Sequence, residues 1–185
     1  MKKILFGIIA VFCLLSMQTV VAQDNMPIGM RMEVAECGSD DNTYSIFSYK
    51  DDDGTVAYYM SLGREYNILE VEGGILGNFT LDHIDEFCLN IGQTPEEAIA
   101  YLDTLLTLFD MEKGTAFEFP CRLATWGAKL GEPSVATCVV VKRFLQGKRL
   151  CFQFKSGNRL AQTDLTKMAV KSLRLSMKLE KSRKM

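Results

Sequence analysis

A single clear helix pattern stands in the middle of this chain, with strand patterns on both sides of it. Thr94 is a candidate N-cap, Pro95 suits the first helical position, and Glu97 lies where a capping box places its acid. Apolar residues then recur with helical spacing. We therefore predict a helix over 95–112, with Gly114 as the residue that ends it.

The segments around this helix are rich in aromatic and β-branched residues, or alternate apolar and polar residues, as strands do. Asp51-Asp52-Asp53-Gly54 separates two of them and predicts a hairpin turn, because Gly tolerates a positive φ. Strands grouped before and after a helix predict an α+β fold with an antiparallel sheet of about six to eight strands. The predicted strands are 30–36, 43–50, 55–62, 66–72, 87–91, 117–123, 135–144 and 149–155.

A second hairpin is predicted on either side of 145–148. If those four residues close it, Cys151 lies opposite Lys142, and Cys138 lies on the same face as Cys151 but too far from it for a disulfide. In this register the packed face of the hairpin consists of Val139, Val141, Leu150, Phe152 and Phe154.

The C-terminal segment fits two structures. Residues 173–181 alternate with period two, as a strand would, but Leu, Lys, Met and Ala favour a helix. We favour a helix over about 163–182, capped by Asp164 and packed on the same face of the sheet as the first helix. Five cations fall on one arc of it and form either a solvated face or a binding surface for an anionic partner: Lys167, Lys171, Arg174, Lys178 and Lys181.

The first twenty-two residues have the pattern of a secretory signal peptide. Lys2 and Lys3 precede an apolar run that is short for a membrane span, and small or branched residues end at Ala22. The two-lysine start and the Ala22-Gln23 junction resemble those of proteins exported by Gram-negative bacteria, a resemblance that covers this segment alone. We expect cleavage after Ala22, a periplasmic or secreted protein, and a single domain over 23–185 without a transmembrane segment.

Charge is divided unevenly along the predicted mature chain. Residues 23–118 hold 20 acids and 4 bases, whereas residues 119–185 hold 3 acids and 15 bases. Either the two halves attract each other within one fold, or the basic half meets an anionic partner. Aromatic residues do not interleave with the bases and export removes the chain from the cytoplasm, so we expect no nucleic acid.

The sequence gives little sign of catalysis. His83 is the only histidine, the five cysteines that remain after cleavage include no C-x-x-C pair, and the acids at 40–41 and 51–53 lack the alternate spacing of a calcium loop. We therefore expect no catalytic residues, no metal and no cofactor. The tyrosines before residue 67 fit either packing or an exposed contact surface.

These observations predict an exported, non-enzymatic binding module, whose partner is a protein or an envelope component. Two alternatives stay open: a structural or assembly protein that uses a sheet edge, and a hydrolase whose catalytic groups are unassigned. The pairing of Cys37, Cys88, Cys121, Cys138 and Cys151 and the oligomeric state are also left open.

Overall fold

The computed structural model describes residues 26–39, 42–71, 79–125, 129–144, 147–156 and 159–184. The predicted signal peptide at 1–22 and the acids at 40–41 lie outside these residues, as does the side chain of His83. Eight strands and two helices confirm a mixed α+β fold in which the sheet is the larger part. No described helix is long and apolar enough to span a bilayer.

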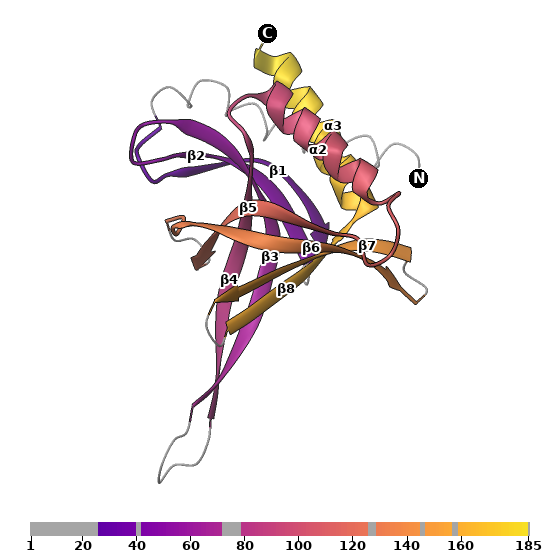
Figure 1. Cartoon of the computed structure of the whole chain (residues 1–185). Coiled ribbons are helices and arrows are strands. Elements are labelled where there is room, and N and C mark those ends of the chain that lie inside the picture. The colour runs from indigo at the N-terminus through magenta and orange to yellow at the C-terminus, as the bar shows by residue number, and fades with distance from the viewer. Residues whose placement is uncertain are drawn as a thin grey trace, which may run out of the picture.

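All eight strands belong to one antiparallel sheet, and each pairs with the strand that follows it in the chain (Figure 1). Helix α2 is inserted between the fourth and fifth strands. The strands are β1 (Arg31–Ser39), β2 (Asn42–Lys50), β3 (Val56–Val71), β4 (Phe79–Gly92), β5 (Ala116–Thr125), β6 (Pro133–Arg143), β7 (Gly147–Ser156) and β8 (Arg159–Thr166).

The sheet curls so that its last strand approaches the early ones. Thr163 of β8 donates a hydrogen bond from Oγ1 to the carbonyl of Leu62 in β3, at 3.0 Å. The hydroxyl of Tyr44 in β2 donates to the carbonyl of Asp164, at 2.5 Å. Since β8 is paired only with β7 in the sheet, these cross-sheet bonds hold the curled end against β2 and β3.

The β2–β3 hairpin forms as predicted. Lys50 pairs with Val56, and the amide of Gly54 donates to the carbonyl of Asp51 at 2.9 Å. Gly54 has φ +83°, a conformation that costs other L-residues strain, which explains why glycine occupies the turn. Asp53 accepts a hydrogen bond from the Thr55 amide at 2.8 Å.

The predicted register of the β6–β7 hairpin is wrong. Lys142 pairs with Lys148 instead of Cys151, because the loop is a residue shorter and Gly147, at φ +76°, pairs with Arg143. The register moves by an odd number of residues, which exchanges the two faces of a strand. The packed face of β6 therefore carries Ala136, Cys138 and Val140, in place of Val139 and Val141.

Helix α2 spans Pro95–Leu108, so it begins where predicted and ends four residues early. Thr94 Oγ1 accepts the Glu97 amide at 3.2 Å, and Glu97 in turn accepts the Gln93 amide at 2.7 Å. After Leu108 the backbone closes tighter turns, and the amide of Gly114 donates to Val140 of β6. Gly114 therefore links this segment to the sheet and does not cap the helix.

Helix α3 spans Lys167–Lys184 and confirms a helix over 173–181, although it begins four residues later than predicted. The preceding segment is strand β8, since its pairing with β7 buries Leu165. Asp164 is therefore not the cap. Thr166 Oγ1 accepts the Ala169 amide at 3.0 Å and takes that role.

The largest hydrophobic cluster contains residues of both helices and of the sheet. Leu102 and Leu105 of α2, and Leu173 and Met177 of α3, are buried in the same cluster as Phe152 of β7. The two helices also lie against each other (Figure 1). A second, smaller cluster is formed by Phe47, Tyr49, Ala57, Tyr59, Cys88, Ala124 and Leu130.

Candidate functional site

The basic arc of α3 is divided between two environments. Three of its five cations reach acids of α2 or of the turn that follows it, and both sets of residues are spaced by seven along the chain. Because the numbering of one set rises as the other falls, the helices are antiparallel here. The pairs are Lys167–Asp110 (2.9 Å), Arg174–Asp103 (2.5 Å) and Lys181–Glu96 (3.2 Å).

These contacts lower the pKa values of two exposed acids, one in α2 and one just after it. The hydrogen bond from Lys167 is the main reason why the pKa of Asp110 is lowered. A backbone hydrogen bond and then the hydrogen bond from Lys181 lower the pKa of Glu96. Both acids therefore stay charged to lower pH than usual. The three cations are engaged within the fold and are not displayed to a partner.

The other two cations of the arc, Lys171 and Lys178, are exposed and make no ion pair with a described residue. Large apolar side chains flank them on the same outward face of α3, because 100° per residue places Met168, Leu175 and Leu179 on one stripe. All three of these apolar residues are exposed. The outward face of α3, defined by these five residues, is both apolar and basic.

A second candidate site lies around the smaller hydrophobic cluster. Arg31 of β1 lies 4.6 Å from the ring centroid of Phe47 and forms a 2.5 Å ion pair with Glu86 of β4. The side chain of Glu86 is only 1% exposed. Arg31 Nε and Nη2 and the hydroxyl of Tyr49 are buried and have no hydrogen-bond partner among the described residues. A buried charge pair and unpaired donors mark this cluster as energetically sensitive.

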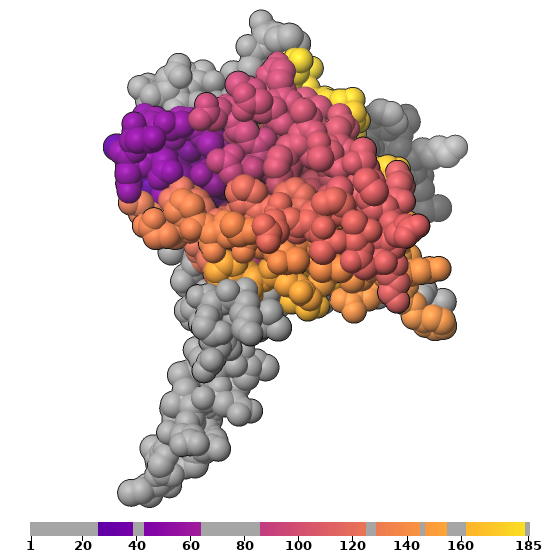
Figure 2. Space-filling model, in the orientation of Figure 1, coloured from indigo at the N-terminus to yellow at the C-terminus, as the bar shows by residue number. Residues whose placement is uncertain are grey.

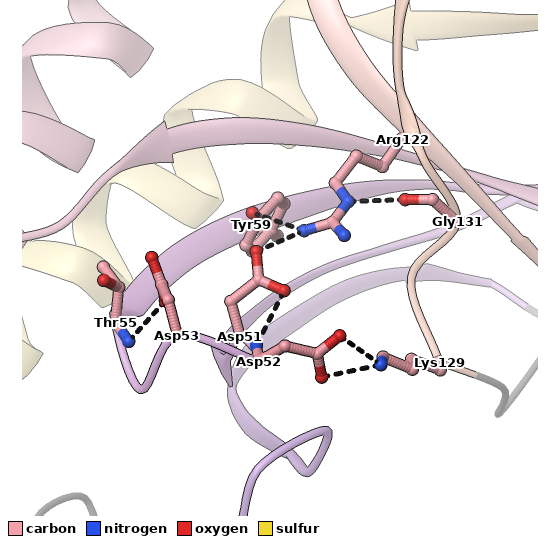
Figure 3. Close-up of polar contacts among 8 residues, drawn as sticks. All are labelled: Asp51, Asp52, Asp53, Thr55, Tyr59, Arg122, Lys129 and Gly131. Atoms are coloured by element: carbon pink, nitrogen blue, oxygen red, sulfur yellow. Dashed lines mark hydrogen bonds and ion pairs between the residues drawn. The ribbon is translucent and has the colours of Figure 1, made fainter.

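Arg122 of β5 ties the same side of the sheet together (Figure 3). Its Nη1 donates to Asp51 at 2.7 Å and to the hydroxyl of Tyr59 at 3.4 Å, while its Nε donates to the carbonyl of Gly131 at 2.6 Å. Burial alone would lower the pKa of Arg122, but the hydrogen bonds to Tyr59 and Asp51 outweigh it and raise the pKa. The hydrogen bond from Arg122 lowers the pKa of Asp51.

Next to this network, Lys129 pairs with Asp52 at 2.5 Å, so a second base of the C-terminal half holds the acidic hairpin (Figure 3). The spacing of Asp51 and Asp52 predicts solvated turn acids, not ligands of a calcium ion. In the structure they face cations instead. Among the described residues, no group of three or more His, Cys, Asp or Glu side chains is placed to hold a metal ion.

The sequence missed this arginine network because its members lie on separate strands. The only available signal was the charge imbalance, which predicted attraction between the halves without naming a pair. From the sequence, the tyrosines before residue 67 fit either packing or an exposed contact surface. Tyr44, Tyr49, Tyr58 and Tyr59 are buried, which supports packing. Tyr66 and Trp126 lie where no side chain is described.

All five cysteines of the described chain are free thiols. Burial is the main reason why each pKa is raised, to about 11 for Cys121 and Cys151 and to about 12 for Cys138. Cys88 and Cys37 have raised pKa values for the same reason. A thiol with a raised pKa is protonated at neutral pH and is a poor nucleophile.

Comparison of the chain with protein-family models, with curated proteins and with solved structures gives no match. The chain carries two candidate sites, the outward face of α3 and the arginine cluster around Arg31 and Arg122. Of the two, the outward face of α3 is open to a partner, whereas the arginine cluster is packed and paired within the sheet.

Proposed function

We propose that this chain is an exported, non-enzymatic binding module that holds a protein or an envelope component through the outward face of α3. The observation that carries the proposal is the division of the basic arc. Three of its cations are paired with acids in or just after α2, while Lys171 and Lys178 remain exposed beside Met168, Leu175 and Leu179. Several large apolar side chains exposed on one face are typical of interaction sites.

Export, to the periplasm or beyond, is supported by the order of basic, apolar and small residues over 1–22. A single domain over 23–185 is supported by the large cluster, to which β1, β8 and both helices contribute. The same cluster supports the finer expectation that both helices cover one face of the sheet. No cofactor or nucleic acid is part of this proposal.

The two alternatives have less support. Assembly through a free sheet edge requires an accessible β1 or β8, but α3 contacts both of these strands. A thiol hydrolase requires a thiolate, but burial raises the pKa of every described cysteine.

Photo-crosslinking in the native cell tests the proposal. A photoreactive amino acid at Leu175 should give a defined adduct, whereas the same group at Thr137, which is exposed on β6, should not. Equal labelling at both positions, or none at Leu175, would count against α3 as the binding face. Mass spectrometry of the same samples should show a chain that begins at Gln23, and a retained Met1 would refute the export step.

A further inference from the structure

We propose that one end of the molecule docks on an anionic lipid surface, with Phe144 and Met168 entering the bilayer interface and nearby cations contacting the headgroups. This inference rests on the proposed binding role of α3 and names the chemistry of its partner. It extends the binding surface from α3 to the β6–β7 turn.

Three elements meet at this end. Lys148 of the β6–β7 hairpin donates from Nζ to the carbonyl of Met111 just after α2, at 2.7 Å. The first residue of α3, Lys167, pairs with Asp110 of the same α2 terminus. In the sheet, Arg149 pairs with Thr166 immediately before α3. Figure 1 accordingly shows the end of α2, the start of α3, the end of β6 and the start of β7 on one side of the molecule.

Each of these elements presents a large apolar side chain to solvent. Phe144, in the turn after β6, is 90% exposed, Met168 in the first turn of α3 is 81% exposed, and Met111 after α2 is 43% exposed. From Met168 the exposed stripe continues along α3 to Leu175 and Leu179. In the space-filling view the orange end of the hairpin projects from the body (Figure 2).

The charge around these apolar residues is positive and only partly balanced. Lys142 and Lys148 are exposed and face each other directly across the hairpin, an arrangement that destabilises a sheet unless an anion lies nearby. Lys113 and Lys171 are exposed around the same end. Of the nearby carboxylates, Asp110 is held by Lys167, Asp164 is held by Arg143, and Glu112 is exposed.

The shape of this surface favours a bilayer over a folded protein. The apolar side chains protrude from a turn, from the first turn of a helix and from the residues after another helix. A protein partner would need a matching hollow for each one. A bilayer interface accepts protruding apolar side chains anywhere, and anionic headgroups attract the Lys and Arg residues around them. The mixture of exposed Phe, Met and Lys is therefore suited to a lipid surface.

Sedimentation with vesicles tests the proposal on the chain from Gln23 onward, so that the apolar leader cannot insert. The protein should bind vesicles of phosphatidylglycerol mixed with phosphatidylcholine, and should bind phosphatidylcholine alone much more weakly. Phe144→Ser should reduce affinity roughly tenfold to a hundredfold if its side chain is fully buried. Lys142→Gln and Lys171→Gln should each reduce it about fivefold, and added salt should do the same in a graded way.

Val135→Ser is the matched control. Val135 is 55% exposed on the same strand as the turn, but at the opposite end of β6. The Val135→Ser variant should bind anionic vesicles as well as the unchanged protein does. Circular dichroism should show that every variant is folded. Equal loss in Val135→Ser, no preference for the anionic vesicles, or no vesicle binding would each overturn the lipid proposal. A crosslink at Leu175 to a protein would, in those cases, leave the proposed binding function standing.

Discussion

The buried ion pair between Arg31 and Glu86 provides the sharpest test of the packing described here. Glu86 is 1% exposed, whereas the side chain of Arg31 is 19% exposed. Among the described side chains, Arg31 is the one cation paired with Glu86, so Arg31→Met removes that partner and leaves the carboxylate buried. Breaking a buried pair in this way costs about 3–5 kcal/mol. Loss of the contact with the Phe47 ring adds about 0.5–2 kcal/mol.

The reverse change should be milder. Glu86→Gln leaves a neutral side chain in the buried position, while Arg31, which is 19% exposed, keeps its contact with the Phe47 ring. We expect a loss of about 1–3 kcal/mol, the usual penalty for a buried polar group that loses its partner. The double variant should lose less than Arg31→Met alone, because the uncompensated charge is gone.

Urea denaturation measures these differences, since a shift of the midpoint at constant slope reports the free energy of unfolding. The matched control is Arg143→Met. Arg143 also pairs with an acid, Asp164, but its side chain is 44% exposed, so the loss should stay below about 1 kcal/mol. If Arg31→Met is as stable as Arg143→Met, the pair is not energetically buried. If the double variant Arg31→Met, Glu86→Gln loses more stability than the two single variants together, the two residues do not stabilise each other.

Three further outcomes are expected. Thr94→Ala should lower the free energy of unfolding by about 1 kcal/mol in the same urea assay, because α2 loses its side-chain cap. In native protein, a thiol-alkylating reagent followed by mass spectrometry should modify half-buried Cys37 before Cys88, which should react only on unfolding. Melting temperatures measured as pH falls should decline once the pH passes below 3.8, the ordinary pKa of Asp51. The hydrogen bond from Arg122 lowers the pKa of Asp51 in the folded protein. The contribution of Asp51 to stability is therefore complete above pH 3.8 and is lost as its carboxylate becomes protonated. Asp51→Asn should flatten this decline.

The features that could be predicted from the sequence are local ones. The cap at Thr94, the Gly54 turn and the helical content of 173–181 each depend on neighbouring residues, and the structure confirms them. The errors lie where distant segments decide. Pairing with β7 extends strand β8 to Thr166, and a backbone bond to Val140 determines where Gly114 lies. Neither partner can be identified from periodicity.

The β6–β7 hairpin shows that a small error in loop length can change which residues are assigned to the core. Turn chemistry around Gly147 was recognised, but the loop length was off by one residue. In the observed register, other residues of β6 face the core than predicted, and Cys138 lies in the large cluster opposite Phe152. The pattern of apolar residues along β6 could not have revealed the error, because both faces of this strand carry apolar side chains.

The candidate site was predicted in part, for a reason that the helix pairs explain. All five cations of the arc do share one side of α3, but the sequence did not relate their spacing of seven to the same spacing of Glu96, Asp103 and Asp110 in α2. Comparing the two spacings would have separated the three paired cations from Lys171 and Lys178. The charge imbalance along the chain is then explained largely within the fold, since these pairs and those of Arg122 and Lys129 join the basic half to the acidic half.

The same spacing shows that charge does not set the register of α3 on α2. If α3 moved along by four residues, Lys171 and Lys178 would replace Lys167 and Arg174 opposite their acids, and two of the three pairs would form again. That shift would also carry Arg174 into the buried place of Val170, and Lys181 into that of Met177. Burying two unpaired cations costs far more than exposed ion pairs return. Apolar packing therefore fixes the position of α3, and with it the residues that α3 presents to a partner.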